Sequence, residues 1–159
     1  MVKVGRSAVV AGAAVLVLTL TASSSADPQA AAPDAKGRVP LTVAASSDVN
    51  PDSSGRPSPI VLRIFQLKSD ATFSRADYSG LLDDDQRALG SELIIRDEFV
   101  LVPSENRNLQ IAISPDSRFV AAAAGFRDIR NAEWRVLVPT PIRGLTVSVE
   151  KARVRVFPD

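Results

Sequence analysis

Residues 47–67, SDVNPDSSGRPSPIVLRIFQL, place a long loop directly before a strand, and this pairing guides the interpretation of the whole chain. The first part, residues 47–59, holds three prolines and one glycine among small polar residues, a composition that excludes a regular element. The second part, residues 60–67, is apolar and β-branched and has the length of a strand. A loop this long inside a small domain is uncommon and is often functional.

The sequence on both sides of this strand predicts an all-β domain. Apolar residues recur at every second position in short segments that turn residues separate. These segments are 39–45, 97–102, 108–113, 119–126, 133–138 and 145–149, followed after a turn at 150–152 by a last strand through Val154 and Val156. The turn is required because the apolar residues change there from odd to even positions. Eight short strands predict a sandwich of two sheets.

Residues 69–93 interrupt the strand pattern and predict a helical insertion. Three short helices are expected, near 70–74, 76–82 and 84–89. One capping box is expected from Ser74 to Asp77, and another begins at Asp83. The acidic run at 83–85 is interpreted as helix capping rather than metal binding, because consecutive carboxylates point in different directions and helix N-termini favour acids.

The first 26 residues have the layout of a secretory signal peptide. Lys3 and Arg6 form a basic start, residues 8–20 form an apolar run with one threonine, and small residues follow. This run is shorter than the ~20 residues of a membrane span. Export and cleavage before Asp27 are therefore expected.

Ser23 occupies a second pattern in the same segment. Leu20-Thr21-Ala22-Ser23 is similar to a lipoprotein signal box, Leu-x-x-Cys, with serine at the acylated position. A hydroxyl does not replace the thiol that carries the lipid. This segment has three interpretations: a degenerate lipobox, a chance match within an ordinary signal peptide, and a retained signal anchor. Residues 27–38, rich in alanine, proline and charge, are expected to be a flexible tether to the domain at 39–159.

Composition removes several classes of function. The chain holds no cysteine and no histidine, so thiolate nucleophiles, zinc–thiolate sites and imidazole acid–base chemistry are excluded. Lys3 and Arg6 are the only charges before residue 27, which leaves 17 basic against 18 acidic residues in the remainder. A body this close to neutral has no electrostatic footprint for nucleic acid. No catalytic residue, metal site or cofactor is predicted.

Several motifs along the domain resemble one known family. They are Asn50-Pro51-Asp52, Gly55-Arg56-Pro57-Ser58-Pro59 running into Val61-Leu62-Arg63-Ile64-Phe65-Gln66-Leu67, then Ala76-Asp77-Tyr78, Glu98-Phe99 with Pro103, Phe126-Arg127-Asp128 and Trp134-Arg135. In this order they resemble the TssJ (SciN) family of type VI secretion lipoproteins, over about residues 39 to 157. The resemblance implies a transthyretin-like sandwich with a short helical insertion.

The resemblance also implies a function, that of a binding module. Family members are outer-membrane lipoproteins that face the periplasm and bind the periplasmic domain of the inner-membrane protein TssM. The loop between the first two strands is their partner-binding element. It corresponds here to Asp48, Val49, Asn50, Pro51, Asp52, Gly55 and Arg56. Attachment to the inner face of the outer membrane depends on a lipid or another route, because Ser23 stands where the family has cysteine.

Two other classes of function are weighed against this one. A periplasmic small-ligand carrier is the alternative, because transthyretin-like sandwiches host other roles. A deep apolar cavity between the sheets would favour it. An enzyme requires a pair of carboxylates that the sequence does not reveal, so the protein is predicted not to be an enzyme.

Overall fold

The structure, a computed structural model, describes residues 37–140 and 142–159. The expected signal peptide with Ser23, and nearly all of the expected tether, lie outside the described residues. Every strand and helix of the described part lies within one compact unit, Ala35–Asp159. Because its sheets and apolar clusters lie within these bounds, this unit has what a domain needs to fold on its own.

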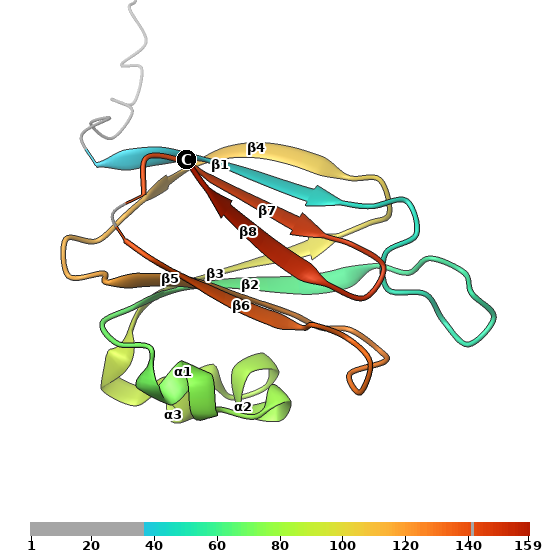
Figure 1. Cartoon of the computed structure of the whole chain (residues 1–159), viewed down its shortest axis with the longest axis horizontal. Helices are drawn as coiled ribbons and strands as arrows, with labels where there is room; N and C mark the ends of the chain where they lie inside the picture. The colour runs from blue at the N-terminus through green and yellow to red at the C-terminus, as the bar shows by residue number, and fades with distance from the viewer. Residues whose placement is uncertain (1–36, 141) are drawn as a thin grey trace, which may run out of the picture. The chain divides into compact units, whose positions relative to one another are not determined.

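Eight strands form two sheets that pack face to face (Figure 1). They are β1 (Arg38–Ala45), β2 (Ile60–Leu67), β3 (Leu93–Leu101), β4 (Asn106–Ala112), β5 (Phe119–Ala124), β6 (Arg135–Pro139), β7 (Leu145–Val149) and β8 (Val154–Pro158). One sheet has the order β4-β1-β7-β8 and the other β3-β2-β5-β6. Neighbouring strands are antiparallel, except that β1 and β7 run parallel. The predicted all-β sandwich of two sheets is confirmed.

The strand limits differ from the predicted ones where pairing overrides the apolar pattern. β3 begins at Leu93 instead of residue 97, because residues 93–96 pair with the end of β2. β5 ends at Ala124 instead of residue 126, because the main chain turns away after Gly125, whose N–H still donates to the Val61 carbonyl at 2.8 Å. The predicted turn after β7 is present, and it joins β7 and β8 as a hairpin.

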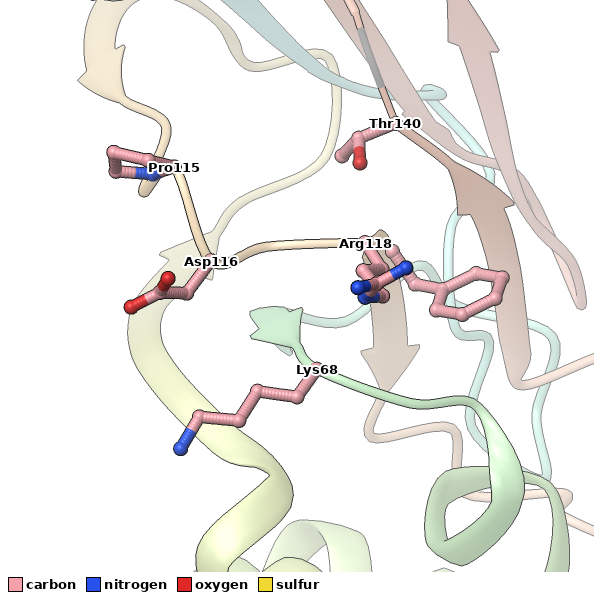
Figure 2. A pocket seen from close by; sticks show the side chains of 6 residues that line it. Lys68, Pro115, Asp116, Arg118 and Thr140 are labelled. Carbon is pink, nitrogen blue, oxygen red and sulfur yellow. The ribbon is translucent and has the colours of Figure 1, made fainter.

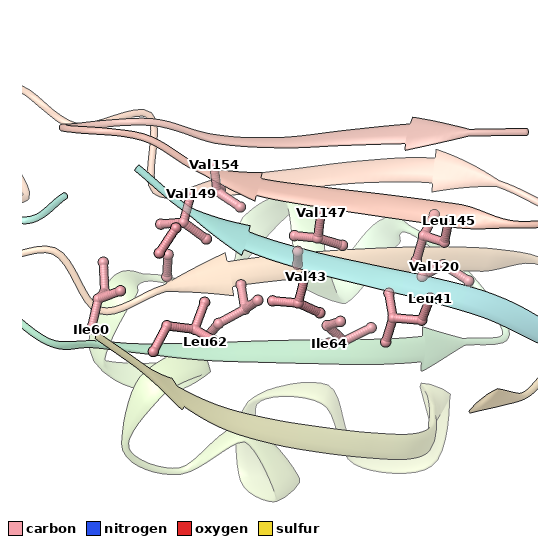
Figure 3. Close-up of a cluster of buried hydrophobic side chains, with 14 of the residues drawn as sticks. Leu41, Val43, Ile60, Leu62, Ile64, Val120, Leu145, Val147, Val149 and Val154 are labelled. Carbon is pink, nitrogen blue, oxygen red and sulfur yellow. The ribbon is translucent and has the colours of Figure 1, made fainter. Parts of the chain in front are cut away.

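The core between the sheets is filled by alternate side chains of the central strands. Ile60, Leu62 and Ile64 of β2 are at most 2% exposed and face β1 and β7 across the sandwich. Figure 3 shows these side chains meeting those of the opposite sheet, among them Val43 and Val147. This closely packed interior is the main source of the domain's stability, because apolar burial contributes about 25 cal/mol per Å².

The helical insertion covers the outer face of the second sheet. It consists of α1 (Ala71–Arg75), α2 (Tyr78–Leu82), α3 (Asp85–Leu89) and a 3-10 turn, η1 (Gly90–Glu92). Its Phe73, Leu81 and Leu89 are buried in a second apolar cluster with Phe65 and Leu67 of β2. β5 contributes Ala121 and Ala123 to the buried part of this cluster, with Phe119 packed against it, so the helices approach the middle of the strand closely. The predicted insertion is therefore present.

The predicted caps of the helices are displaced. Ser74 lies inside α1 and caps nothing, whereas Asp77 caps α2 by accepting from the Gly80 N–H at 2.7 Å. Asp84, not Asp83, caps α3. The reason is that Asp85, the next residue, turns inward and is held by the sheet.

An ion-pair network attaches α3 to the sheet. Asp85 is 4% exposed, and its Oδ2 accepts from Arg63 of β2 at 2.9 Å and from Arg96 of β3 at 3.0 Å. Arg63 also pairs with Glu98 at 2.7 Å. Charges this well buried are tolerated because each has a hydrogen-bonded partner.

Candidate partner-binding site

Three loops meet at the end of the sandwich where β1 ends. They are the β1–β2 loop (residues 46–59), the β5–β6 loop (residues 125–134) and the β7–β8 turn (residues 150–153), and together they are called the loop end. The β1–β2 loop projects beyond the sheets (Figure 1). The opposite end of β1, at Arg38, is where the N-terminal segment joins the domain.

Asn50 ties the three loops together. Its Nδ2 donates to the Pro59 carbonyl at 2.9 Å within its own loop, and its Oδ1 accepts from the Arg127 N–H at 2.9 Å. Its own N–H donates to the Lys151 carbonyl at 3.1 Å. Asn50 is 3% exposed and has a φ of 48°, a left-handed conformation that asparagine tolerates better than most residues. It is a structural anchor of the loop end.

Val49 is also part of the fold rather than of the surface. The sequence suggested a small apolar contact for a partner, but Val49 is 0% exposed and belongs to the core between the sheets. The loop folds back over the end of the sandwich, and the Ser58 N–H donates to the Val49 carbonyl at 3.1 Å. An apolar side chain in an otherwise polar loop is buried by this turn of the chain. It is therefore not available for contact with a partner.

The exposed tip of the loop is a turn organised by one carboxylate. Oδ1 of Asp52 accepts from the main-chain N–H groups of Ser54 at 2.8 Å and Arg56 at 3.0 Å. Its Oδ2 pairs with the Arg56 guanidinium at 2.8 Å. The N–H of Arg56 is the first cause that lowers the pKa of Asp52, and the Arg56 side chain and Ser54 add to it. Gly55 takes the positive φ of 78° that closes the turn.

The predicted loop residues thus have different positions. Asp48 is exposed and accepts from the Ser46 hydroxyl at 2.7 Å. Arg56 is exposed, with 79% of its side chain accessible to solvent. Pro51 is half-buried and lines a cavity. Asp48, Asp52, Gly55 and Arg56 stay candidates for partner contact, whereas Val49 and Asn50 support them from below.

A small cavity of about 110 Å³ lies at the base of the loop, where the three loops meet. Its apolar lining comes from Pro51, Phe126, Ala132 and Ala152. Asp128 and Lys151 add charged groups, and Asn50 completes the wall. Sequence reasoning did not select Phe126, Asp128 or Lys151 as site residues, because they are far from the loop in sequence and only the folded domain brings them next to it. Phe126-Arg127-Asp128 did appear among the motifs, which was the available signal.

The insertion supports this cavity from the side of the second sheet. The Tyr78 hydroxyl donates to the Phe126 carbonyl at 2.9 Å. Burial raises the pKa of Tyr78, and Asp83 adds to the shift, so the hydroxyl keeps its proton as a donor. Trp134 packs edge-on against Tyr78 with ring centroids 5.2 Å apart, and Arg135 lies over the Trp134 ring at 4.8 Å. Trp134 is therefore structural rather than a platform for a ligand.

A wider depression of about 820 Å³ lies at the other end of the sandwich (Figure 2). Lys68, Asp116 and Arg118 line it, with Pro115, Phe119 and Thr140. Its charged groups point outward along an open surface, and it has no apolar floor of the kind that holds a small ligand. The space between the sheets is occupied by core side chains, so neither cavity is the deep apolar one that would favour a ligand carrier.

Metal-binding and membrane-spanning features were sought in the described part of the chain. Among residues 37–140 and 142–159, no group of three or more acidic side chains is placed to hold a metal ion. Within the same ranges, no helix has the length and hydropathy needed to cross a bilayer.

Comparisons with known proteins agree with the fold. The sequence profile of a family described as type VI secretion lipoproteins, which include VasD, EvfM and TssJ, matches residues 37–157. No protein with a curated description matches the chain in sequence.

Solved structures of similar fold include two lipoproteins. The crystal structure of the type VI secretion lipoprotein TssJ1 from Pseudomonas aeruginosa is 31% identical, with a TM-score of 0.72, over 77% of this chain and 95% of that one. Lip from Serratia marcescens, a membrane-bound component of the type VI secretion system, is 25% identical, with a TM-score of 0.70, over 76% of this chain and 96% of that one. A chain of a type VI membrane complex, 24% identical with a TM-score of 0.68 over 77% and 98%, shares the fold.

Proposed function

The chain belongs to the SciN (TssJ) family of type VI secretion lipoproteins, and from this membership we propose that it docks the periplasmic domain of TssM beneath the outer membrane. The observation that carries the proposal is the match to the family over residues 37–157. The protein acts as a binding component of the secretion system's membrane complex, without catalysis.

The tip of the β1–β2 loop is the proposed contact. Asp52 and the main chain hold the tip in one conformation, so little ordering is required on binding. Arg56 presents a planar five-donor group to the solvent, and Asp48 presents an acceptor. Fixed polar groups of this kind suit a protein surface better than a small ligand.

The test is to replace the tip, residues 53–57, with glycine and serine while Val49, Asn50 and Asp52 are kept. The N–H groups that bond Asp52 are main-chain groups and survive, so the melting temperature should change little. Affinity for the periplasmic domain of TssM should fall at least about tenfold, or ~1.4 kcal/mol. Calorimetry on residues 27–159 measures it.

Two single substitutions provide a matched pair. Arg56→Ser removes an exposed arginine at the loop end, and Arg118→Ser removes one at the other end. Only the first should weaken binding. Equal affinities of the wild type and the tip variant, with equal melting temperatures, would rule out this loop as the contact.

A further inference from the structure

We propose that the cavity at the base of the loop is the seat of one aliphatic side chain of the bound partner, from a segment in which acidic residues flank it. The inference rests on the proposed function, because it names what the partner inserts beside the loop tip. The cavity lies between the β1–β2 loop, the β5–β6 loop and the β7–β8 turn, so it borders the proposed contact directly.

Its size selects a side chain rather than a free ligand. Pockets for small molecules measure ~300–1,000 Å³, and this cavity has about 110 Å³. A single water needs only ~10–15 Å³ of such space, whereas an apolar cavity of ~150 Å³ takes up benzene. The volume therefore suits a group of the size of a leucine or isoleucine side chain.

Its walls select an apolar group. Pro51, Phe126, Ala132 and Ala152 supply carbon surface, and Phe126 is only 3% exposed. The polar atoms of Asn50 are already used, because its side chain bonds Pro59 and Arg127. Asp128 already accepts from Asn131 at 2.7 Å, so Lys151 is the charged group of the lining that a guest could still contact. A polar guest would lose more hydrogen bonds to water than Lys151 could replace.

The cavity is rigid before any partner arrives. Asn50 fixes the loops on one side, and the Tyr78 hydroxyl holds the Phe126 carbonyl on the other. The Glu133 N–H donates to the Ala152 carbonyl at 2.9 Å, which joins the two alanine-bearing segments. A preformed cavity lowers the ordering cost of binding, and such pockets are where hot-spot side chains insert.

The charges around the cavity favour a partner segment that has acidic residues beside the inserted side chain. Arg127, Arg130 and Lys151 are exposed at the loop end and form no salt bridge with another described residue. Asp48 and Asp128 oppose them, each already bonded to a neighbour in its own loop. Among the charged side chains of these loops that form no salt bridge, three are positive and two are negative. Carboxylates beside the inserted side chain would therefore be favoured.

The binding arm of the test fills the cavity. Ala152→Leu and Ala132→Leu place a side chain in the space, and each should weaken the affinity of residues 27–159 for the periplasmic domain of TssM about tenfold or more. Ala112→Leu, the same change at an exposed position on β4 away from the loop end, should bind as the wild type does. Lys151→Glu should weaken binding and reduce its dependence on salt.

The second arm examines the cavity without the partner. N-acetyl-leucine amide should shift the backbone amide resonances of Asn50, Ala132 and Ala152 saturably, N-acetyl-glycine amide should not, and Ala152→Leu should abolish the effect. If N-acetyl-leucine amide causes no shift beyond that caused by N-acetyl-glycine amide, the proposal is overturned. This outcome does not depend on whether the filled variants fold. Wild-type affinity in both folded, filled variants overturns it as well and leaves the proposed function standing. A wild type that does not bind TssM overturns the proposed function itself.

Discussion

At the residue scale, the loop end depends on Asn50. Its side chain bonds Pro59 in its own loop and also Arg127, which lies 77 positions from Asn50 in sequence. Both bonded groups are main-chain atoms in irregular segments, where no ladder provides an alternative partner. The positive φ adds a second reason for asparagine at this position. Composition identified the loop, but it did not reveal that Val49 and Asn50 are buried, because burial of a loop residue depends on where the loop folds back.

Asn50→Ala should therefore destabilise the domain by about 2–4 kcal/mol, because two partly buried main-chain groups lose their partner and alanine disfavours the left-handed conformation. Asn50→Gly should cost less, because glycine accepts that φ. Urea unfolding of residues 27–159 measures both. Asn106→Ala, at an exposed asparagine at the start of β4, is the control and should change stability by less than about 0.5 kcal/mol. Equal stability of the Ala and Gly variants would refute the conformational part of this explanation.

At the element scale, the acidic run before α3 shows what sequence alone can and cannot assign. Strand and helix periods predicted the eight strands and the insertion, because alternation with period two is local information. The three aspartates at 83–85 are identical in composition, and only the fold distinguishes them. Asp83 is exposed, Asp84 caps α3, and Asp85 turns toward Arg63 and Arg96. The sequence correctly predicted that this run caps α3, but the capping residue is Asp84 rather than Asp83.

Alanine substitutions along this run should rank accordingly. Asp85→Ala should cost about 3–5 kcal/mol, because Arg63 remains buried with one fewer partner. Asp84→Ala should cost ~1 kcal/mol for a lost cap, and Asp83→Ala close to nothing. Urea unfolding gives the order, and limited proteolysis reports whether α3 leaves the sheet. A cost for Asp83→Ala as large as that for Asp85→Ala would contradict the role given to the network.

At the scale of the whole molecule, β1 separates two functions. Its first residue, Arg38, follows the segment predicted to hold a signal peptide, and its last, Ala45, leads into the loop proposed to bind the partner. Eight residues are separated by seven steps of ~3.3 Å, which place these ends about 23 Å apart. The motifs predicted the family and its fold from residues spread over the domain. The cavity was beyond sequence reasoning, because it is made by three loops that only the closed sandwich brings together.

This separation leads to a prediction about anchoring. Ser23 follows Leu20, Thr21 and Ala22, so Ser23→Cys should complete a lipobox and allow acylation during export. The variant should incorporate labelled palmitate and move to the membrane fraction, because acyl chains contribute ~0.8 kcal/mol for each buried methylene. The wild type has no cysteine and should not be labelled.

Ser25→Cys is the matched control, because alanine rather than leucine stands three residues before it. Affinity for the periplasmic domain of TssM should be unchanged, since residue 23 precedes β1 in sequence and the chain enters β1 at Arg38, the end away from the loop. If Ser23→Cys stays unlabelled, the lipobox interpretation is wrong, and if the lipid alters affinity, the two ends of β1 are not independent.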